Sequence, residues 1–332
     1  MKNPPGGIDV AVVIVSYNTA ALTLQAVASA FASSGVDVEV WVVDNASVDG
    51  SADLIREAFP LAHVLALGEN VGFGRANNVA LKEVRAPWVL LLNSDARLRG
   101  PGDLRRLVDL LGAAPGVAAV GPRLESPEGR LEHSARAFPG VLRELVRPLG
   151  IHKLLPTGIQ APLLGQEFRD HGVPADTDWV TGACLLVRRE VFDRVGGFDP
   201  AIFLFAEELE WCWRVHRAGW RIRLEPGVTV EHLGGASGKA PGAGKLRLAA
   251  AGEAYAVRKH RGVAYLGLFT LARLVGLSAE VLIQGVLGAA TGAGERRVRA
   301  GHARAALTAF VWALSAGGSR SPSGPALRGD PA

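Results

Sequence analysis

The chain has 332 residues, of which 48% are hydrophobic and 20% charged, a composition that favours a sizeable core and excludes a disordered chain. Only two cysteines occur, Cys184 and Cys212, which excludes a disulfide framework and a cysteine-rich zinc module and fits a reducing cytoplasm. The formal net charge is +4. The N-terminus carries only a short apolar run, which indicates a strand and not a signal peptide.

The charge is unevenly distributed along the chain. Residues 236–332 contain 13 Lys and Arg against 4 Asp and Glu, whereas residues 1–235 contain 23 against 28. A basic C-terminal part indicates an anionic partner, either nucleic acid or a membrane surface. Residues 1–235 therefore form the candidate catalytic part of the chain.

Apolar strands alternate with helical segments over the first hundred residues. Strands that are apolar throughout and separated by helices predict a parallel sheet covered on both faces. In such sheets, ligands bind outside the carboxyl ends of the strands. The predicted strands are residues 10–15, 39–45, 62–70 and 86–95, and the helices between them are residues 19–34, 49–59 and 72–84.

The pattern weakens at residues 112–176, where many prolines predict a strand, a long loop and short helices. Order returns with a predicted strand at 179–187 and a helix at 188–197 that ends at a glycine C-cap. Residues 219–235 predict two short strands separated by a turn. Residues 236–245 predict a mobile loop.

A helical part is predicted at residues 246–316. Within it, residues 264–292 are apolar but interrupted by Arg273, Glu280 and Gln284, whereas a clean transmembrane span carries fewer interruptions. We therefore expect a helix that lies on or partly in an anionic bilayer surface. A packed helical hairpin is the alternative.

Polar residues follow the predicted strands. An acid after the second strand is where nucleotide-binding sheets place a partner for the ribose or base, although a local turn that leads into a helix is the simpler alternative. The polar residues are Ser16, Tyr17 and Asn18 after the first strand and Asp44, Asn45 and Ser47 after the second.

The segment NVGFGRANN, residues 70–78, partly mimics a dinucleotide-binding fingerprint. That fingerprint belongs in the first strand-to-helix turn, where this chain has no glycine, so a dehydrogenase is rejected. The fourth strand ends on Asp95. A single aspartate is a poor magnesium cage but an adequate anchor when a bound diphosphate supplies the other oxygens.

The stretch FLFAEELEWCWR places Glu207, Glu208 and Glu210 among bulky apolar residues. Burying unpaired carboxylates is costly, so such acids are paired, solvated at a cleft or bound to a ligand. Glu210 lies four residues before Arg214, the favourable orientation for a helical ion pair, which predicts a structural or orienting role.

The order of these motifs is more specific than any one of them. The series SYN, VVDNAS, GFGRANN, LLNSD, TGACLLVRR and GGFDPAIFLFAEELEWCWR resembles the family 2 inverting glycosyltransferases, most closely their bacterial rhamnosyltransferase-like branch. The resemblance covers residues 10–237. It implies the α/β GT-A nucleotide-diphospho-sugar transferase fold, with a mostly parallel central sheet and helices on both faces, followed here by a C-terminal helical extension.

The resemblance also implies which residues contact the sugar donor. The family's first two motifs hold the nucleotide, and the GF..AN segment borders the nucleotide and the sugar. The TGACLLVRR segment is expected to place a small-residue turn beside the sugar. The matching residues are Ser16, Tyr17, Asn18, Asp44, Asn45, Ser47, Gly72, Phe73, Asn77, Asn78, Asn93, Ser94, Gly182 and Ala183.

The family's Asp-x-Asp metal motif appears here with only its final acid, which implies Asp95 as the ligand of Mg²⁺ or Mn²⁺. The branch also carries a His before Gly-Gly and Ser, matched by HLGGAS, which implies that His232 completes the metal or diphosphate site. A strand-end histidine bonded to backbone is the alternative. The family's Glu-Asp-x-Asp pattern appears as Glu-Glu-x-Glu, which implies Glu208 as the base and leaves Glu207 as the other candidate.

By this resemblance, residues 1–237 form the catalytic domain, 238–316 a basic, hydrophobic membrane-associating segment and 317–332 a disordered tail. We expect an inverting transfer from dTDP-rhamnose, or else a UDP-sugar, to a hydroxyl of a polyprenyl-linked or polysaccharide acceptor in cell-wall or surface glycan synthesis. The enzyme is expected on the cytoplasmic face of the membrane.

Two other functional classes are alternatives to a glycosyltransferase. A non-catalytic nucleotide-sugar-binding module would tolerate loss of Glu208 and Asp95, whereas glycosyl transfer would not. A nucleic-acid-binding protein is rejected, because the basic tail is too hydrophobic and lacks basic segments interleaved with aromatic residues.

Overall fold

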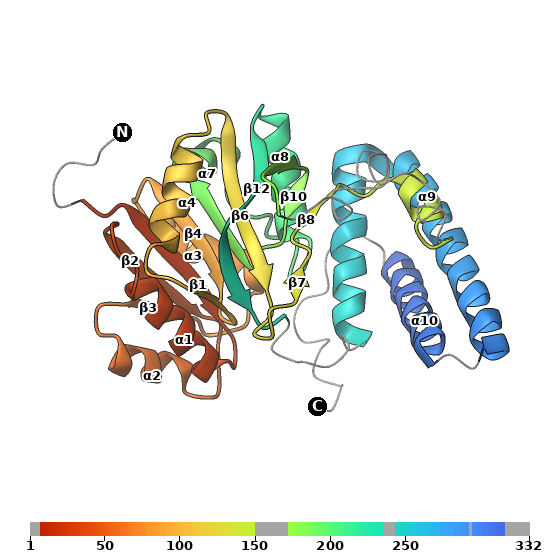
Figure 1. Cartoon of the computed structure of the whole chain (residues 1–332), viewed down its shortest axis with the longest axis horizontal. Coiled ribbons are helices and arrows are strands. Elements are labelled where there is room, and N and C mark those ends of the chain that lie inside the picture. Colours follow the sequence, from red (N-terminus) through yellow and green to blue (C-terminus); the bar gives the residue numbers. More distant parts are fainter. Residues whose placement is uncertain (1–6, 150–171, 235–242, 292–293, 316–332) are drawn as a thin grey trace. The chain divides into compact units, whose positions relative to one another are not determined.

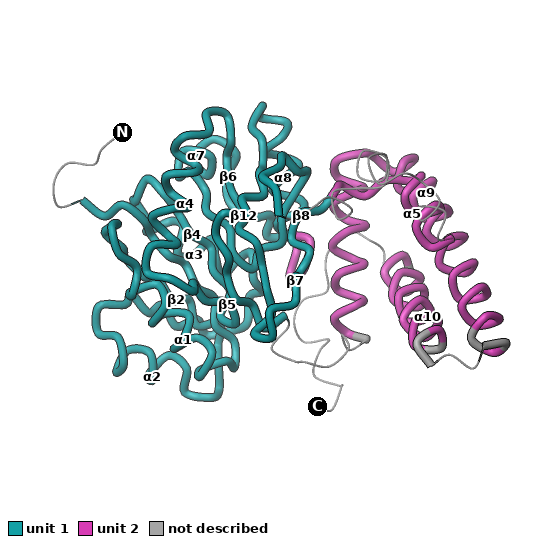
Figure 2. The backbone as a smooth tube through the Cα atoms, viewed as in Figure 1, with its two compact units in different colours: residues 1–136, 170–200, 207–238 teal, residues 137–169, 201–206, 239–332 magenta. Residues whose placement is uncertain are grey.

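The structure, a computed structural model, divides the chain into two compact units (Figure 2). Unit 1 comprises residues 1–136, 170–200 and 207–238, and unit 2 comprises residues 137–169, 201–206 and 239–332. The residues that the structure describes are 7–149, 172–234, 243–291 and 294–315. The predicted disordered tail, most of the predicted loop at 236–245 and part of the weakly patterned region lie outside the described residues.

Unit 1 contains a ten-stranded sheet with helices packed against it (Figure 1). The strands of unit 1 are β1 (Val10–Ser16), β2 (Val38–Asp44), β3 (His63–Ala66), β4 (Trp88–Asn93), β5 (Ala96–Leu98), β6 (Val117–Glu125), β7 (Leu131–Glu132), β8 (Ala135–Arg136), β9 (Ala175–Thr177), β10 (Trp179–Val180), β11 (Cys184–Arg188) and β12 (Arg221–His232). The helices are α1 (Ala20–Phe31), α2 (Ser51–Ala58), α3 (Phe73–Glu83), α4 (Asp103–Gly112), α7 (Arg189–Val195) and α8 (Glu207–Arg217).

The sheet is mixed. Its main path runs β3-β2-β1-β4-β11-β6-β12-β5. The first four strands are parallel, as the alternating pattern predicts, whereas β11 runs antiparallel to both β4 and β6. The chain adds β2 and then β3 on one side of β1, and it places β4 on the other side of β1. Because crossovers between parallel strands are right-handed, α1 and α2 lie on one face of the sheet and α3 lies on the other. The sites of ligand binding are expected where this reversal occurs, at the carboxyl ends of β1 and β4.

The core explains the apolar strands. All seven residues of β1 are buried, which fits a strand covered on both faces. On one face, Val12, Ile14 and Leu90 belong to a continuous cluster with Leu104 and Leu107 of α4. Burying side chains of this size contributes about 1.5–3 kcal/mol each. This cluster fixes the strand ends that carry the candidate site.

Two predicted strand patterns differ from the structure. The stretch 219–235, predicted as two strands, contains a single strand, β12. The register of β12 shifts between Glu225 and Thr229. Pro226 removes a backbone donor there, and the chain absorbs the loss as an irregularity instead of a turn. The predicted strand at 179–187 is two strands, because residues 181–183 leave the ladder between β10 and β11. The helix that follows, α7, ends at Gly196 in the left-handed region (φ 82°), as predicted.

Unit 2 is helical. It contains α5 (Val141–Val146), α9 (Ala243–Thr291) and α10 (Gly294–Ser315), and α9 packs against both α5 and α10. The long α9 is broken at Gly262, whose φ of 86° lies outside the helical region. Among the described residues, one stretch of α9, Gly244–Leu287, is long and apolar enough to cross a membrane by length and composition alone, and 17% of its most apolar window is buried.

Candidate active site

Three polar strand ends lie side by side at one edge of the sheet. The register of β1 with its parallel neighbours β2 and β4 pairs Ser16 with Asp44 and Val15 with Asn93. The loops that follow these strands therefore begin next to each other, as the sequence predicts.

Hydrogen bonds join the loops after β1 and β2. The N–H of Asn18 donates to Ser47 Oγ (2.9 Å), and the N–H of Val48 donates to Asn18 Oδ1 (2.8 Å). Ser16 is fully buried, whereas 48% of Tyr17 is exposed. Of the predicted SYN contacts, Tyr17 and Asn18 are therefore exposed to a ligand, whereas Ser16 is not.

Asp44 keeps one carboxylate oxygen without a partner. It is 3% exposed, and its Oδ2 accepts the N–H of Ser47 at 3.1 Å. Its Oδ1 is buried and has no hydrogen-bond partner in the described structure. The local turn is present, but it uses only half of the carboxylate. Because an unpaired buried acceptor is costly, a donor group of a ligand would be stabilising here.

Asn45 links the second loop to the third. Its Nδ2 donates to Asn70 Oδ1 (2.8 Å), and its Oδ1 accepts the N–H of Val71 (2.9 Å). The N–H of Gly72 also donates to Asn70 Oδ1 (3.0 Å), with Gly72 in the left-handed range of φ (87°). Glycine adopts this conformation without steric cost. Asn70, which is outside the predicted set, therefore holds this corner of the site together.

The amides of Asn77 and Asn78 are engaged with the protein. Asn77 is 1% exposed and donates from Nδ2 to the carbonyl of Phe73 (3.0 Å). Asn78 donates to the carbonyl of Phe198 and accepts its N–H, both at 2.8 Å. In this structure they fix α3 and the loop after α7, and their contact with a donor remains a prediction.

Asp95 and His232 meet, although 137 positions separate them in the sequence. Nε2 of His232 lies 3.3 Å from Asp95 Oδ1, and Nδ1 lies 2.7 Å from Glu132 Oε2. Burial alone would lower the pKa of His232, but its hydrogen bonds and charge interactions with Asp95 and Glu132 outweigh burial and raise the pKa to about 8. Glu132 was missed by the sequence reading, because it comes from a two-residue strand with no motif around it.

The residues between β4 and Asp95 connect to two other segments. The N–H of Asn93 donates to the carbonyl of Ala183 (2.9 Å), and Thr19 donates to Ser94 Oγ (3.1 Å). Asn93 Oδ1 is buried without a hydrogen-bond partner. The predicted turn at Gly182 and Ala183 therefore lies directly beside the end of β4.

Glu207 and Glu208 begin α8 with incompletely bonded carboxylates. Glu208 Oε1 accepts the N–H of Gly182 at 3.1 Å, and a Cβ on Gly182 would lie 3.7 Å from both Glu208 Oε1 and the Phe73 ring. Glu207 is 4% exposed. The Oε2 atoms of both glutamates are buried and lack a hydrogen-bond partner in the described structure. Phe73, Gly182 and Glu208 thus lie close together.

Burial raises the pKa of both Glu207 and Glu208. It raises the pKa of Glu207 well above the ordinary 4.5, and the charge of Glu208 raises it further. Burial also raises the pKa of Glu208, while backbone N–H groups, including that of Gly182, and the charge of Arg136 lower it. Glu208 is therefore the better candidate for the ionised carboxylate of the pair.

The predicted ion pair of Glu210 is present. Arg214 Nη2 lies 2.8 Å from Glu210 Oε2, and the same guanidinium donates to the carbonyls of Val195 and Gly197, each at 2.7 Å. Glu210 is fully buried. This pair ties α8 to the end of α7 and supports the position of the first turn of α8.

The donor set at the sheet edge suits a divalent cation only in part. Asp95 offers a carboxylate, His232 offers an imidazole nitrogen once the ring loses its proton, and Asn93 Oδ1 is an unpaired oxygen two residues from Asp95. No group of three His, Cys, Asp or Glu side chains suited to a metal occurs within the described ranges. Diphosphate oxygens of a ligand would have to complete the coordination, as is usual for Mg²⁺ in nucleotide sites.

Comparison with known proteins identifies the family. The model of glycosyl transferase family 2 matches residues 11–196, more than half of the chain. The chain belongs to glycosyl transferase family 2. This family 2 glycosyltransferase is 30% identical over 235 residues to an N-acetylglucosaminyl-diphospho-decaprenol L-rhamnosyltransferase of Mycobacterium tuberculosis, covering 67% of this chain and 75% of the relative. It is also 26% identical over 172 residues to the rhamnosyltransferase WbbL of Escherichia coli, covering 48% and 60%.

Solved structures agree on the fold of this family 2 glycosyltransferase. A mannosyltransferase of Pyrobaculum calidifontis, solved with GDP-mannose and Mn²⁺, superposes with a TM-score of 0.57 at 19% identity and covers 95% of this chain and 89% of that one. GalNAc-T7, solved with UDP, GalNAc and Mn²⁺, gives 0.53 at 15% identity and covers 76% and 51%. At these identities the likeness shows the fold, and the predicted GT-A fold is confirmed.

Proposed function

We propose that this glycosyltransferase moves rhamnose from dTDP-rhamnose to a hydroxyl of a polyprenyl-diphosphate-linked glycan, with Glu208 as the base. The observation that carries the proposal is the carboxylate of Glu208, which is oriented by the Gly182 N–H through one oxygen and has no hydrogen-bond partner on the other. The choice of sugar and acceptor is supported by the activity for which the mycobacterial relative is named. A UDP-sugar donor is the second candidate.

The proposed chemistry is a single displacement. The acceptor O–H gives its proton to the Glu208 carboxylate, while its oxygen forms a bond to the anomeric carbon. The bond between that carbon and the diphosphate oxygen breaks on the opposite side, and the nucleoside diphosphate leaves with the electron pair. Inversion at the anomeric carbon follows from this in-line geometry.

The strand-end residues are proposed to hold the donor. Tyr17 and Asp44 face the nucleoside, and Asp44 contacts it through its unpartnered Oδ1. Phe73, Gly182 and Ala183 border the sugar. Asp95 and His232 are proposed to anchor Mg²⁺ or Mn²⁺ together with diphosphate oxygens. When bound, the cation supplies positive charge that stabilises the departing diphosphate.

Unit 2 is proposed to hold the enzyme on the cytoplasmic face of the membrane. Support comes from the exposed apolar residues of α9, among them Leu268, Leu271, Val275 and Leu282, each at least 50% exposed. They lie three, four and seven positions apart and so share one face of the helix. The basic C-terminal residues complement an anionic bilayer.

A donor screen tests the function. The full-length protein is incubated with dTDP-rhamnose or UDP-sugars and a polyprenyl-diphosphate-linked N-acetylglucosamine, with and without Mg²⁺ or Mn²⁺, and nucleoside diphosphate release is measured. We expect release from dTDP-rhamnose that requires the acceptor and the cation, and loss of the cation response in Asp95→Asn. Transfer from UDP-sugars alone would overturn the choice of donor, and full activity in EDTA would overturn the role of the cation.

A further inference from the structure

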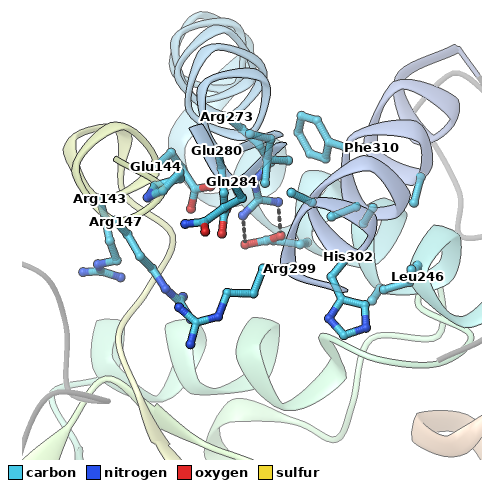
Figure 3. A pocket seen from close by; sticks show the side chains of 18 residues that line it. Arg143, Glu144, Arg147, Leu246, Arg273, Glu280, Gln284, Arg299, His302 and Phe310 are labelled. Carbon is cyan, nitrogen blue, oxygen red and sulfur yellow. Dashed lines mark hydrogen bonds and ion pairs between the residues drawn. The ribbon is translucent and has the colours of Figure 1, made fainter. Parts of the chain in front are cut away.

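Unit 2 contains a cavity of about 620 Å³ that lies among α5, α9 and α10 (Figure 3). This is the size of a small-molecule site, for which about 300–1,000 Å³ is typical. Its walls are partly apolar, with Leu246, Leu277 and Phe310, and partly charged. None of the predicted donor-binding, metal or catalytic residues lines it.

One side of the cavity is a closed ionic cluster. The Arg273 guanidinium donates to Glu144 (2.7 Å) and to both oxygens of Glu253, and it lies 4.5 Å and 4.8 Å from the ring centroids of Phe269 and Phe310. Every charge in this cluster has a partner. The cluster therefore provides a rigid wall and leaves little capacity for a ligand.

The rest of the polar lining is mainly cationic. Arg143 and Arg147 are four positions apart at α5, Arg299 and His302 come from α10, and outside the Arg273 cluster Glu280 is the acid among the described lining residues. Figure 3 shows Arg147 and Arg299 reaching toward each other from the two helices. Like charges that converge are costly unless an anion lies between them. Glu280 partly fills that role, because its carboxylate interacts with the charges of both Arg147 and Arg299.

Two polar atoms of the lining have no hydrogen-bond partner in the described structure. They are Nε of Arg143, a donor, and Oε1 of Gln284, whose amide can present its NH₂ group by rotation. Guanidinium and amide N–H groups are the donors that bind phosphate oxygens most strongly. The lining therefore matches an anion with several oxygens.

The outer surface of α9 indicates how such an anion would arrive. From residue 263 to 287, the only charged or amide side chains are Arg273, Glu280 and Gln284, and all three line the cavity. The opposite face carries the exposed apolar stripe. A helix that is polar toward the protein interior and apolar outward suits contact with lipid, and such contact would bring lipid headgroups to the unit that contains the cavity.

We propose that this cavity binds the diphosphate headgroup of a polyprenyl lipid through Arg143, Arg147, Arg299 and His302. The inference rests on the proposed function, because it places the anchor of the proposed acceptor in unit 2. The same donors would accept a soluble diphosphate, so the experiment has to separate these two sources.

Flotation of the full-length protein with vesicles tests the site. Three kinds of vesicle are compared: phosphatidylcholine alone, phosphatidylcholine with a minor fraction of polyprenyl diphosphate, and phosphatidylcholine with enough phosphatidylglycerol to give the same surface charge. Inorganic diphosphate is added as a soluble competitor. We expect polyprenyl diphosphate to give the tightest binding. Because a hydrogen bond to a charged group contributes about 1.5–3 kcal/mol, Arg147→Gln/Arg299→Gln should weaken this binding about a hundredfold.

Matched variants sharpen the result. Arg258→Gln/Arg261→Gln removes the same charge from exposed residues of α9 that do not line the cavity, and it should weaken binding less than about tenfold. Glu280→Gln removes the competing acid and should tighten binding severalfold. Equal losses in the two arginine pairs would overturn the site and leave only surface attraction. Binding of inorganic diphosphate through the cavity arginines, with no preference for polyprenyl diphosphate vesicles, would overturn the lipid assignment.

The test also separates this inference from the proposed function. If polyprenyl diphosphate binds through the cavity but no donor sugar is transferred to it, the function fails and the site stands. If transfer to the lipid-linked acceptor occurs and Arg147→Gln/Arg299→Gln leaves both the KM for that acceptor and vesicle binding unchanged, the site fails and the function stands.

Discussion

The two units differ in how the acids that they shield from solvent are paired. In unit 2, Glu144 and Glu253 are both bonded to Arg273, so no charge of the cluster lacks a partner. In unit 1, Glu207 and Glu208 each keep one buried oxygen without a hydrogen bond, and burial raises the pKa of both. Paired charges hold a structure together, whereas unpaired ones cost stability and are retained where a ligand or a proton completes them.

The helix α8 contains both kinds of acid within one turn. Glu210 is fully buried, and the guanidinium of Arg214 satisfies it. Two residues in the left-handed region, Phe205 (φ 65°) and Ala206 (φ 68°), directly precede Glu207. Strain of this kind persists where the surrounding structure imposes it, and it is common at functional sites. The partners of a buried acid, more than its burial, therefore distinguish structural from reactive residues.

The largest expected effect comes from neutralising the proposed base. Glu208→Gln preserves shape and removes proton acceptance, so kcat should fall about 10²–10⁴-fold, the usual contribution of general base catalysis, with the KM for donor nearly unchanged. Glu207→Gln is the matched control and should retain most of the rate. Steady-state nucleoside diphosphate release measures both. A wild-type rate in Glu208→Gln together with an inactive Glu207→Gln would make Glu207 the base.

The second prediction breaks the paired cluster in unit 2. Arg273→Leu leaves the half-buried Glu144 and Glu253 without their cation, which should destabilise the protein by about 1–3 kcal/mol, because water still reaches part of both carboxylates. Arg304→Leu removes an exposed arginine of α10 and should change stability by less than about 0.5 kcal/mol. Urea unfolding followed by far-ultraviolet circular dichroism, to which the long α9 and α10 contribute strongly, measures both. Equal midpoints for the two variants would show that the cluster is not structural.

The sequence predicts the parts of the site that are set locally. Apolar strands that end in polar residues place Ser16, Asp44 and Asn93 at one edge, because the register of parallel strands brings their ends together. The spacing of Glu210 and Arg214 predicts their ion pair, because four residues make one helical turn.

Contacts between distant segments could not be predicted in the same way. Glu132 bonds His232 across 100 positions, and no periodicity marks it. Arg273, Glu280 and Gln284 appear in the sequence as interruptions of an apolar helix. The structure gives them a common cavity, because only the packing of α5 and α10 determines which face of α9 is inside.

The smallest expected effect concerns the pH dependence of stability. The pKa of Glu207 is raised in the folded state above its ordinary value of 4.5, so the folded protein holds this proton more tightly than the unfolded chain. Its contribution is fully present below about pH 4.5 and is lost as the pH rises through the raised pKa. Across that window one such group lowers the free energy of unfolding by at most about 1.4 kcal/mol per pH unit.

Glu207→Gln should remove this slope, because the amide does not titrate. The free energy of unfolding of the variant, measured by urea titration from pH 4.5 upward, should therefore rise relative to the wild type as the pH increases. Glu57→Gln removes an exposed carboxylate from α2 and should leave the difference from wild type flat. A flat difference for Glu207→Gln as well would mean that folding does not raise the pKa of Glu207. The contrast between the two units would then rest on Glu208 alone.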